Sequence, residues 1–412
     1  MVEVHELNLR HLLAVAAVAE AGSISAASPV VSLSQPALTQ ALGRLEKQLQ
    51  IALFSRHPGG MAATEAARLL VPRVRRASSY IARGVQQARR SVRLTALPGV
   101  ERRVTLSQLR ALTEVADGGS YSLAAARSGI SQPAVYRAMS ELAELVEVPL
   151  VQRRGKAVQL TGAATRMLRF ARLARSELQA GLDELAALGS QGAGRITLGT
   201  LPLARAVLLP RVLARFSRAN PGATISVIEG QYLELLGHLR EGSLDMIVGA
   251  MRNPVPVRDV VQEALFDDQP VIVARSGHPL AGKPLDFSRL LDYPWVISAP
   301  GAPLRARWKQ MFLERGMEPP RLRIECGSVM VMRGLMLEDD WLTLMSPDQL
   351  LIERRAGLLC ELGSAGPSVR RRIALTTRGD WHPTRLQAQF VATFKEVCAE
   401  REDPIVWPFR YP

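Results

Sequence analysis

Ser34-Gln-Pro-Ala-Leu-Thr-Gln-Ala-Leu-Gly-Arg-Leu45 returns 97 residues further along the chain as Ser131-Gln-Pro-Ala-Val-Tyr-Arg-Ala-Met-Ser-Glu-Leu142. The same offset aligns Gly22-Ser23 with Gly119-Ser120, Arg56 with Arg153 and Thr64 with Thr161, without a gap. About a third of the positions from 9 to 66 are identical to their partners, and such self-similarity marks a repeated structural unit. Two widely spaced copies are too few for a stacked solenoid. The chain therefore carries a duplicated module of about 60 residues, followed by a different domain.

The second copy shows most clearly what the module is. Leu106, Leu109 and Leu112 recur at helical spacing, which predicts an amphipathic first helix. Ser120 can cap a short second helix, and Ser131 can cap a third helix whose first turn holds a proline. Two helices joined by a tight turn, the second opening with small polar residues, are typical of a helix-turn-helix.

The third helix has two unlike faces. Val135, Met139 and Leu142 form an apolar face that predicts core, whereas Tyr136 and Arg137 lie on the opposite face. In a helix-turn-helix the N-terminal side chains of such a helix reach base edges in the major groove. The alternative interpretation is that these residues only cap the helix and fill the core; it holds for the leucines, and we expect DNA contact for the opposite face.

A basic hairpin is expected after the third helix. Residues 149–161 predict two short strands around a turn at Gly155, with Arg153, Arg154 and Lys156 on the hairpin. Cationic side chains there would contact phosphates. Each copy is therefore predicted to be a winged helix-turn-helix.

Composition narrows the function. The net charge of the 412 residues is +14, and residues 1–188 hold 24 Lys and Arg against 14 Asp and Glu, compared with 28 against 24 in the rest. A basic repeated half favours nucleic acid as the partner, although an Arg-rich soluble surface would have the same charge. The three cysteines are too few and too far apart for a disulfide framework or a metal cage. We expect no metal, no cofactor, no membrane span, no signal peptide and, in the absence of common catalytic motifs, no enzymatic activity.

The C-terminal half has another pattern. Gly192-Ala-Gly194 predicts a hinge, after which strand-like and helix-like runs alternate. This alternation predicts a mainly parallel α/β sheet. Small ligands bind such sheets beyond the carboxyl ends of the strands.

Taken together, these features closely resemble the LysR-type transcriptional regulators. The first copy offers Gly22-Ser23, Ser34-Gln35-Pro36-Ala37 and Leu53-Phe54-Ser55-Arg56; the second offers Gly119-Ser120, Ser131-Gln132-Pro133-Ala134 and Leu160-Thr161-Gly162. The resemblance covers nearly the whole chain, but the family normally has one such module. It implies an α+β multidomain protein with two winged helix-turn-helix modules and linker helices, then a two-lobed, periplasmic-binding-protein-like (type 2) effector domain. The expected ranges are 7–66 and 104–163 for the modules, 67–95 and 164–190 for the linker helices, and 194–400 for the effector domain.

The two copies depart differently from the family pattern. The first has Pro29 inside its second helix, where it removes a backbone hydrogen bond, and Gln40 where the second has Arg137. We expect the second copy to be the more conventional DNA reader, and we leave open whether the first contacts DNA. The expected DNA contacts are Ser34, Gln35, Pro36, Thr39, Gln40 and Arg56 in the first copy, and Ser131, Gln132, Pro133, Tyr136, Arg137, Arg153, Arg154 and Lys156 in the second.

The effector half looks most like the subgroup of the galactose-binding-protein regulator. By that resemblance the effector would be a sugar or an aromatic catabolite, and its contacts would be Thr200, Leu201, Pro202, Gln231, Met251, Ser298, Pro300 and Ser328. The alternative is that these residues are turn residues that end strands. Cys326 lies in one of these loops, and we interpret it as a small half-buried residue rather than a redox sensor. His238, His278 and His382 are expected to be surface or loop residues.

The sequence thus predicts a cytoplasmic, LysR-type regulator whose promoter binding responds to a small molecule. Promoter DNA, the effector and RNA polymerase are the expected partners, and the chain is expected to form a homo-oligomer, either a dimer or a tetramer. An architectural DNA-binding protein with a vestigial ligand domain is the alternative. The sequence leaves open the effector, the operator and whether the protein activates or represses.

Overall fold

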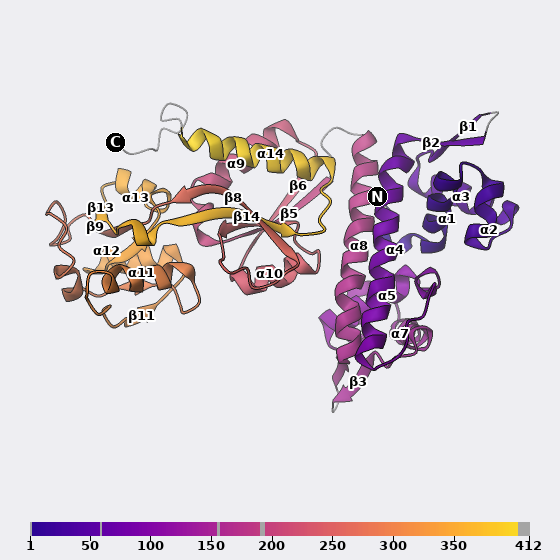
Figure 1. Cartoon of the computed structure of the whole chain (residues 1–412), viewed down its shortest axis with the longest axis horizontal. Coiled ribbons are helices and arrows are strands. Elements are labelled where there is room, and N and C mark those ends of the chain that lie inside the picture. The colour runs from indigo at the N-terminus through magenta and orange to yellow at the C-terminus, as the bar shows by residue number, and fades with distance from the viewer. Residues whose placement is uncertain (1, 58–59, 155–156, 190–193, 403–412) are drawn as a thin grey trace. The chain divides into compact units, whose positions relative to one another are not determined.

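The computed structural model describes residues 2–57, 60–154, 157–189 and 194–402, and the chain forms two compact units that divide near residue 195 (Figure 1). The hinge predicted at residues 192–194 lies mostly outside the described residues, since the description resumes at Gly194. No helix of the described ranges is long and apolar enough to cross a membrane.

The first unit contains the same succession of elements twice. The first copy comprises the 3-10 turn η1 (Val4–Glu6), α1 (Leu9–Ala21), α2 (Ile24–Val31), α3 (Gln35–Leu49), β1 (Phe54–His57), β2 (Gly60–Ala63) and the long α4 (Glu65–Ser91). The second comprises η2 (Val100–Arg102), α5 (Leu106–Gly118), α6 (Tyr121–Ser128), α7 (Gln132–Val146), β3 (Val151–Arg154), β4 (Ala157–Leu160) and α8 (Gly162–Gly189). Apart from η2, every element of the second copy begins 97 residues after its counterpart, so the sequence repeat is a structural repeat.

Local chemistry fixes the helix boundaries alike in both copies. The hydroxyls of Ser34 and Ser131 accept hydrogen bonds from backbone N–H groups in the first turns of α3 and α7. Ser32, at φ 52°, occupies the left-handed position that Gly129 fills in the second copy, and it caps the end of α2 at Val31. Pro29 does lie inside α2, but only two residues before its end. The backbone hydrogen bond that it cannot donate is therefore missing only from the last turn of the helix.

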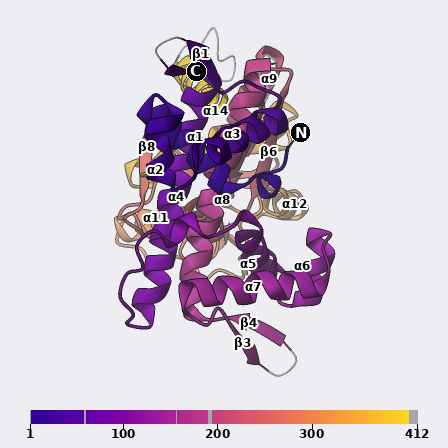
Figure 2. The same ribbon diagram turned by 90° about the vertical axis from the view of Figure 1, so that its right-hand side faces the viewer.

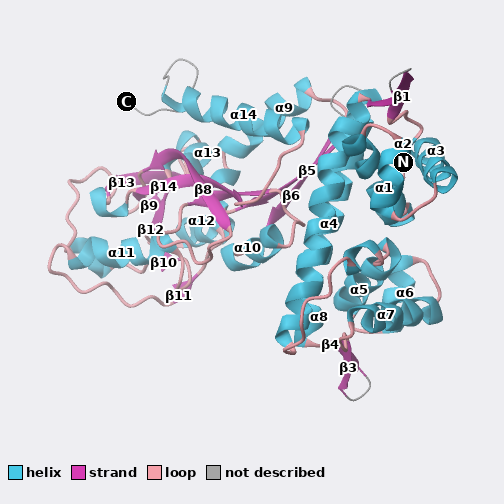
Figure 3. Ribbon diagram, turned by 45° about the vertical axis from the view of Figure 1, so that its right-hand side comes forward, coloured by secondary structure: helices cyan, strands magenta, loops and turns pink. Residues whose placement is uncertain are grey.

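The long helices α4 and α8 pack against each other along their lengths. They run antiparallel, because Arg73 near the start of α4 meets Glu184 near the end of α8, whereas Gly84 late in α4 faces Phe170 early in α8. The two modules lie at opposite ends of this helix pair (Figures 2 and 3). One continuous hydrophobic core joins both copies and both long helices.

The second unit is two-lobed. A five-stranded sheet of order β6-β5-β7-β14-β8 forms one lobe, and a three-stranded sheet of order β12-β9-β13 with the parallel pair β10–β11 forms the other. Its strands are β5 (Gly194–Thr200), β6 (Ala223–Glu229), β7 (Met246–Ala250), β8 (Val260–Asp268), β9 (Val271–Arg275), β10 (Val296–Ile297), β11 (Ile324–Glu325), β12 (Thr343–Met345), β13 (Leu359–Ser364) and β14 (Arg371–Arg378). Its α-helices are α9 (Leu208–Ala219), α10 (Tyr232–Arg240), α11 (Pro303–Leu313), α12 (Val329–Glu338), α13 (Leu351–Arg355) and α14 (Arg385–Ala399).

The expectation of a mainly parallel sheet is wrong. Strand β5 pairs parallel with β7, but β14 runs antiparallel to both β7 and β8. The chain leaves the first lobe after β8, builds the second lobe from β9 to β13, and returns in β14. Strand order along the sequence could not show that this last strand enters the middle of the first sheet in the reverse direction.

Candidate DNA-binding and effector sites

The predicted recognition helices α3 and α7 expose the residues that the sequence assigned to DNA. Gln35, Gln40, Gln132 and Arg137 are all exposed, while the opposite faces are buried in the module cores. Among the described residues, Arg137 has no hydrogen-bond or ion-pair partner, so its guanidinium is available to an external acceptor. Ser34 and Ser131 cap their helices, as the alternative interpretation expects. Both residues are also exposed, so their hydroxyls can reach DNA as well.

Aromatic side chains distinguish the second module from the first. Tyr136 on α7 is 56% exposed, and its ring meets that of Tyr121 on α6 edge to face, with centroids 5.4 Å apart. The first module has Thr39 and Ile24 at these positions, and the Thr39 hydroxyl donates to the Gln35 carbonyl oxygen of its own helix, 2.9 Å away. Nothing in the sequence near Tyr121 marks it as part of this face, because only the fold brings the two rings together.

Charge also distinguishes the two recognition helices. The exposed side of α3 carries Arg44 and Lys47, where α7 carries Glu141 and Glu144. The Glu141 carboxylate accepts a hydrogen bond of 3.4 Å from the amide of Gln108 on α5. The C-terminal half of α3 is therefore suited to a phosphate backbone, and the same part of α7 is not.

Both predicted hairpins are present as antiparallel strand pairs. Arg56 lies on β1 opposite Met61, and Arg153 lies on β3 opposite Val158. Arg154 also belongs to β3. The side chains of these three arginines, the predicted turn at Gly155 and Lys156 lie outside the described residues.

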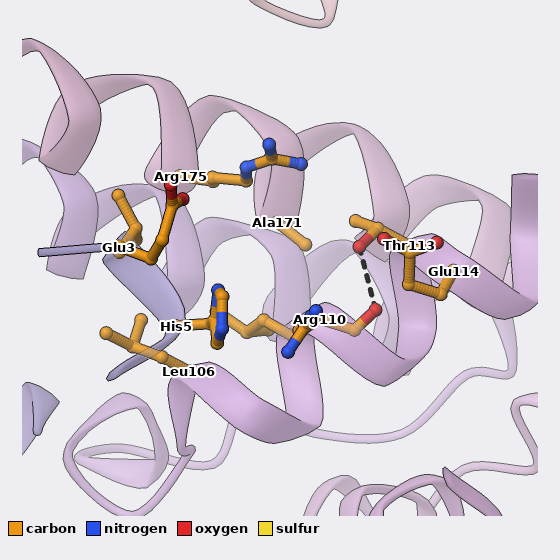
Figure 4. Close-up of a pocket in the computed structure, with 10 residues that line it drawn as sticks. Glu3, His5, Leu106, Arg110, Thr113, Glu114, Ala171 and Arg175 are labelled. Atoms are coloured by element: carbon orange, nitrogen blue, oxygen red, sulfur yellow. Dashed lines mark hydrogen bonds between the residues drawn. The ribbon is translucent and has the colours of Figure 1, made fainter. Parts of the chain in front are cut away.

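The N-terminal turn η1 packs against the second module rather than only against its own. It contacts α5 and α8, and a small pocket lies at this junction. Figure 4 shows Glu3, which caps the turn, and His5 within it lining this pocket together with Arg110 of α5 and Arg175 of α8. None of the predicted effector residues lines this pocket.

In the first lobe of the second unit, the predicted effector residues follow three strands of one sheet. Thr200 ends β5 and is fully buried, Gln231 follows β6 and is exposed, and Met251 follows β7 and is half-buried. Leu201 and Pro202 continue from β5 into the turn η3 (Pro202–Arg205). These residues occupy strand ends, where the α/β architecture places ligands.

In the second lobe, Ser298 and Ser328 follow the parallel strands β10 and β11. The Ser298 hydroxyl is buried and finds no hydrogen-bond partner among the described residues. Its carbonyl oxygen accepts from Arg305 at 3.3 Å, and Pro300 lies exposed in the turn before α11. A buried hydroxyl without a partner is costly unless something else satisfies it, which marks this strand end as a place for a polar ligand.

The structure adds a polar cluster that sequence reasoning missed. The Arg252 guanidinium lies 4.3 Å from the centroid of the Tyr232 ring, and the Arg252 backbone N–H donates to Gln262 at 3.0 Å. Burial lowers the pKa of Arg252. The cluster adjoins Gln231 and Met251 in sequence, and that adjacency was the available signal.

Two expectations concern single residues. His278 lies in a loop, as expected, but it is buried there: it is 3% exposed, and its ring lies 4.4 Å, centroid to centroid, from the tilted ring of Tyr293. Cys326 is half-buried, as expected. Its thiol is free, and so are the thiols of Cys360 and Cys398. Burial raises the pKa of Cys398 to about 12, which makes that thiol unreactive. Within the described ranges, no group of three or more His, Cys, Asp or Glu could hold a metal ion.

Family models match the two units separately. The model described as "Bacterial regulatory helix-turn-helix protein, lysR family" matches twice, at residues 9–68 and 106–165. The model described as "LysR substrate binding domain" matches residues 189–399, about half of the chain. The chain belongs to the LysR family of transcriptional regulators. Its second unit is the effector-binding part that this family shares, and its first unit holds the helix-turn-helix in duplicate.

Relatives of this LysR-family chain include one that matches its full length. It is 30% identical over 401 residues to the HTH-type transcriptional regulator GalR of Pseudomonas putida strain KT2440, an alignment covering 97% of this chain and 100% of GalR. It is 30% identical over 278 residues to GbpR of Rhizobium radiobacter, covering 65% of this chain and 89% of GbpR. A full-length OxyR variant from Pseudomonas aeruginosa has a similar fold, with a TM-score of 0.55 at 21% identity over 72% of this chain and 97% of that one. The GalR alignment necessarily spans both winged modules.

Proposed function

We propose that this LysR-family regulator binds promoter DNA through the exposed faces of α3 and α7 together with their wings. The observation that carries the proposal is the free, exposed Arg137 in the first half of a helix whose other face is buried. An Arg at that place can bond bidentately to a guanine edge in the major groove. Gln40 occupies the matching place in the first module.

The second unit is proposed to bind the effector with Thr200, Gln231, Met251, Ser298 and Ser328. Support comes from their common position after strands and from the unpartnered Ser298 hydroxyl. The resemblance to the galactose-binding-protein regulator favours a sugar, with an aromatic catabolite as the second class. Effector binding can change DNA binding only if its affinity differs between two states of the protein.

The remaining expectations complete the proposal. The modules comprise 7–66 and 104–163, the linker helices 67–95 and 164–190, and the effector domain 194–400. The protein would act in the cytoplasm as a homo-oligomer and would recruit RNA polymerase without catalysing a reaction itself. An architectural role has less support, because an effector-type domain with an unsatisfied polar group serves no purpose in a DNA-coating protein.

The test is a DNase footprint on the region upstream of the protein's own gene, with Gln40→Ala and Arg137→Ala as matched variants. Arg137→Ala should weaken specific binding by about 1–3 kcal/mol if it bonds to a base. Unchanged protection and unchanged preference among operator variants would contradict base contact by Arg137. Uniform protection of unrelated DNA would favour the architectural role.

A further inference from the structure

The pairing of α4 with α8 is held by a buried ion cluster that needs one helix of each kind. The Arg73 guanidinium on α4 donates to Glu177 at 3.2 Å and to Glu184 at 3.2 Å, both on α8. All three side chains are less than a tenth exposed. Arg76 adds a second donor to Glu177 at 2.9 Å.

The repeat supplies an internal comparison for this cluster. The repeat position of Arg73 on α4 is Phe170 on α8. The repeat position of Glu177 on α8 is Tyr80 on α4. Their rings lie 6.4 Å apart between centroids, so an aromatic contact replaces the ion pair on the other side of the pseudo-twofold axis. The counterpart of Glu184 on α4 is Gln87.

This asymmetry favours the pairing of α4 with α8 over a pair of two α4 helices or of two α8 helices. Two α4 helices packed in the same way would place Arg73 against Tyr80, leaving its charge buried without a carboxylate. Two α8 helices would bury Glu177 against Phe170. Because an unpaired buried charge is strongly unfavourable, both like pairs are disfavoured and α4 with α8 is preferred. A buried polar group that fixes the choice of helix partner acts similarly in coiled coils.

Close packing supports the same pairing from both sides. A Cβ on Gly84 would lie 2.9 Å from the Phe170 Cβ, and a Cβ on Gly181 would lie 3.1 Å from a Leu70 methyl group. Gly84 and Gly181 are equivalent positions of the repeat. Both helices therefore keep a glycine where a side chain of the partner helix packs closely against them.

Contacts at the helix ends tie each module to the other. η1 packs on α5 and α8, while η2 packs on α4 and α1. Arg89 near the end of α4 is 4% exposed and donates to the Val146 carbonyl oxygen at the end of α7 and to Glu147, at 2.9 and 2.8 Å. The first copy's long helix thus positions the second copy's recognition helix.

From these contacts we infer that one chain is a built-in pair of unlike DNA readers, which recognises two half-sites of different sequence in a fixed arrangement. Three of the exposed positions at which the readers differ are Thr39, Gln40 and Arg44 in α3, which correspond to Tyr136, Arg137 and Glu141 in α7. In the major groove an Arg selects guanine and a Gln selects adenine. A Glu accepts from the amino group of cytosine, so a Glu and an Arg at equivalent positions select different bases. The inference rests on the proposed DNA binding and adds which DNA is bound, and by how many chains.

The experiment selects binding sites for the full-length protein from duplexes with a randomised central region. We expect two kinds of half-site, in equal numbers and at constant spacing. The matched variant Tyr136→Thr/Arg137→Gln/Glu141→Arg gives α7 the reading residues of α3. It should convert the second kind of half-site into the first, and bind the original element about tenfold or more weakly, the cost of at least one mismatched base pair. All three positions are exposed, and an unchanged far-UV circular dichroism melt checks that the variant folds.

The stoichiometry gives a second, independent result. The protein is titrated with a short duplex that carries one pair of half-sites, and the complexes are sized by sedimentation. Once all protein is saturated with duplex, the complex should contain one duplex per chain, whatever the oligomeric state. A single kind of half-site, or two chains per pair of half-sites, overturns the inference while leaving the regulator function intact. Failure to enrich any sequence overturns the proposed function itself, so the two failures are distinguishable.

Discussion

Replacing Arg73 by alanine should destabilise the first unit selectively. The Arg73 side chain is 4% exposed and holds two carboxylates that are themselves 5% and 9% exposed. After the change, Glu177 keeps Arg76 at 2.9 Å, but Glu184 loses the donor that holds it at 3.2 Å. A buried carboxylate is left without its counter-charge.

The expected loss is about 3–5 kcal/mol, the usual cost of breaking a buried ion pair by removing one partner. For a unit of this size, each kcal/mol corresponds to roughly 2–4 °C in melting temperature, so the transition should fall by about 6–20 °C. Arg75→Ala is the matched control on the same helix. Arg75 pairs with Glu20 on an exposed surface, and such pairs contribute about 0–1 kcal/mol.

The two units can be followed separately in the intact chain. The five tryptophans all lie in the C-terminal half: Trp295, Trp308, Trp341, Trp381 and Trp407. Tryptophan fluorescence therefore reports the second unit, whereas far-UV circular dichroism also reports the helical first unit. Arg73→Ala should lower a circular dichroism transition and leave the fluorescence transition unchanged.

A smaller loss of stability in Arg73→Ala than in Arg75→Ala, or a joint shift of both signals, would contradict a stabilising buried ion cluster between α4 and α8. A rescue variant sharpens the test. Arg73→Phe/Glu177→Tyr/Glu184→Gln copies onto one side the aromatic contact of Phe170 with Tyr80, and should regain most of the lost stability, since apolar groups can replace a buried ion cluster at little cost.

Three further outcomes are expected. Gly84→Ala should destabilise the first unit by about 1–3 kcal/mol because its Cβ would crowd Phe170, whereas Gly43→Ala, with open space around it in α3, should stabilise by about 0.5–1 kcal/mol; circular dichroism melts check both. Ser298→Ala should change the fluorescence transition by less than about 1 kcal/mol, because the hydroxyl it removes bonds to nothing in the described chain; a larger loss would reveal a partner. Burial lowers the pKa of His278 below its usual 6.5, so the unfolded chain binds the proton first and the second unit should lose stability as pH falls through 6.5. Urea midpoints at pH 7.5 and 5.5 should show a smaller drop in His278→Asn, whose amide oxygen can still accept from Leu280 N–H, than in the unchanged protein.

Local patterns in the sequence predicted much of this protein. The repeat at Ser34 and Ser131, the serine caps and the apolar spacing in α5 and α7 act over a few residues, so they could be interpreted without a fold. They predicted both winged modules, the exposed face with Arg137 and the strand ends near Thr200 and Ser298. The roles of those residues in binding remain predictions.

Other features of the fold depend on residues far apart in sequence. Arg73 and Glu177 are separated by 104 positions, and neither residue shows in its own neighbourhood that it is buried or paired. The same holds for the reversed strand β14 and for buried His278. Helix caps and periodicity are local, so they were enough to predict two winged helix-turn-helix modules. The structure decided that the two modules form one pair within a chain, because desolvated charges and close-packed glycines act only where distant segments meet.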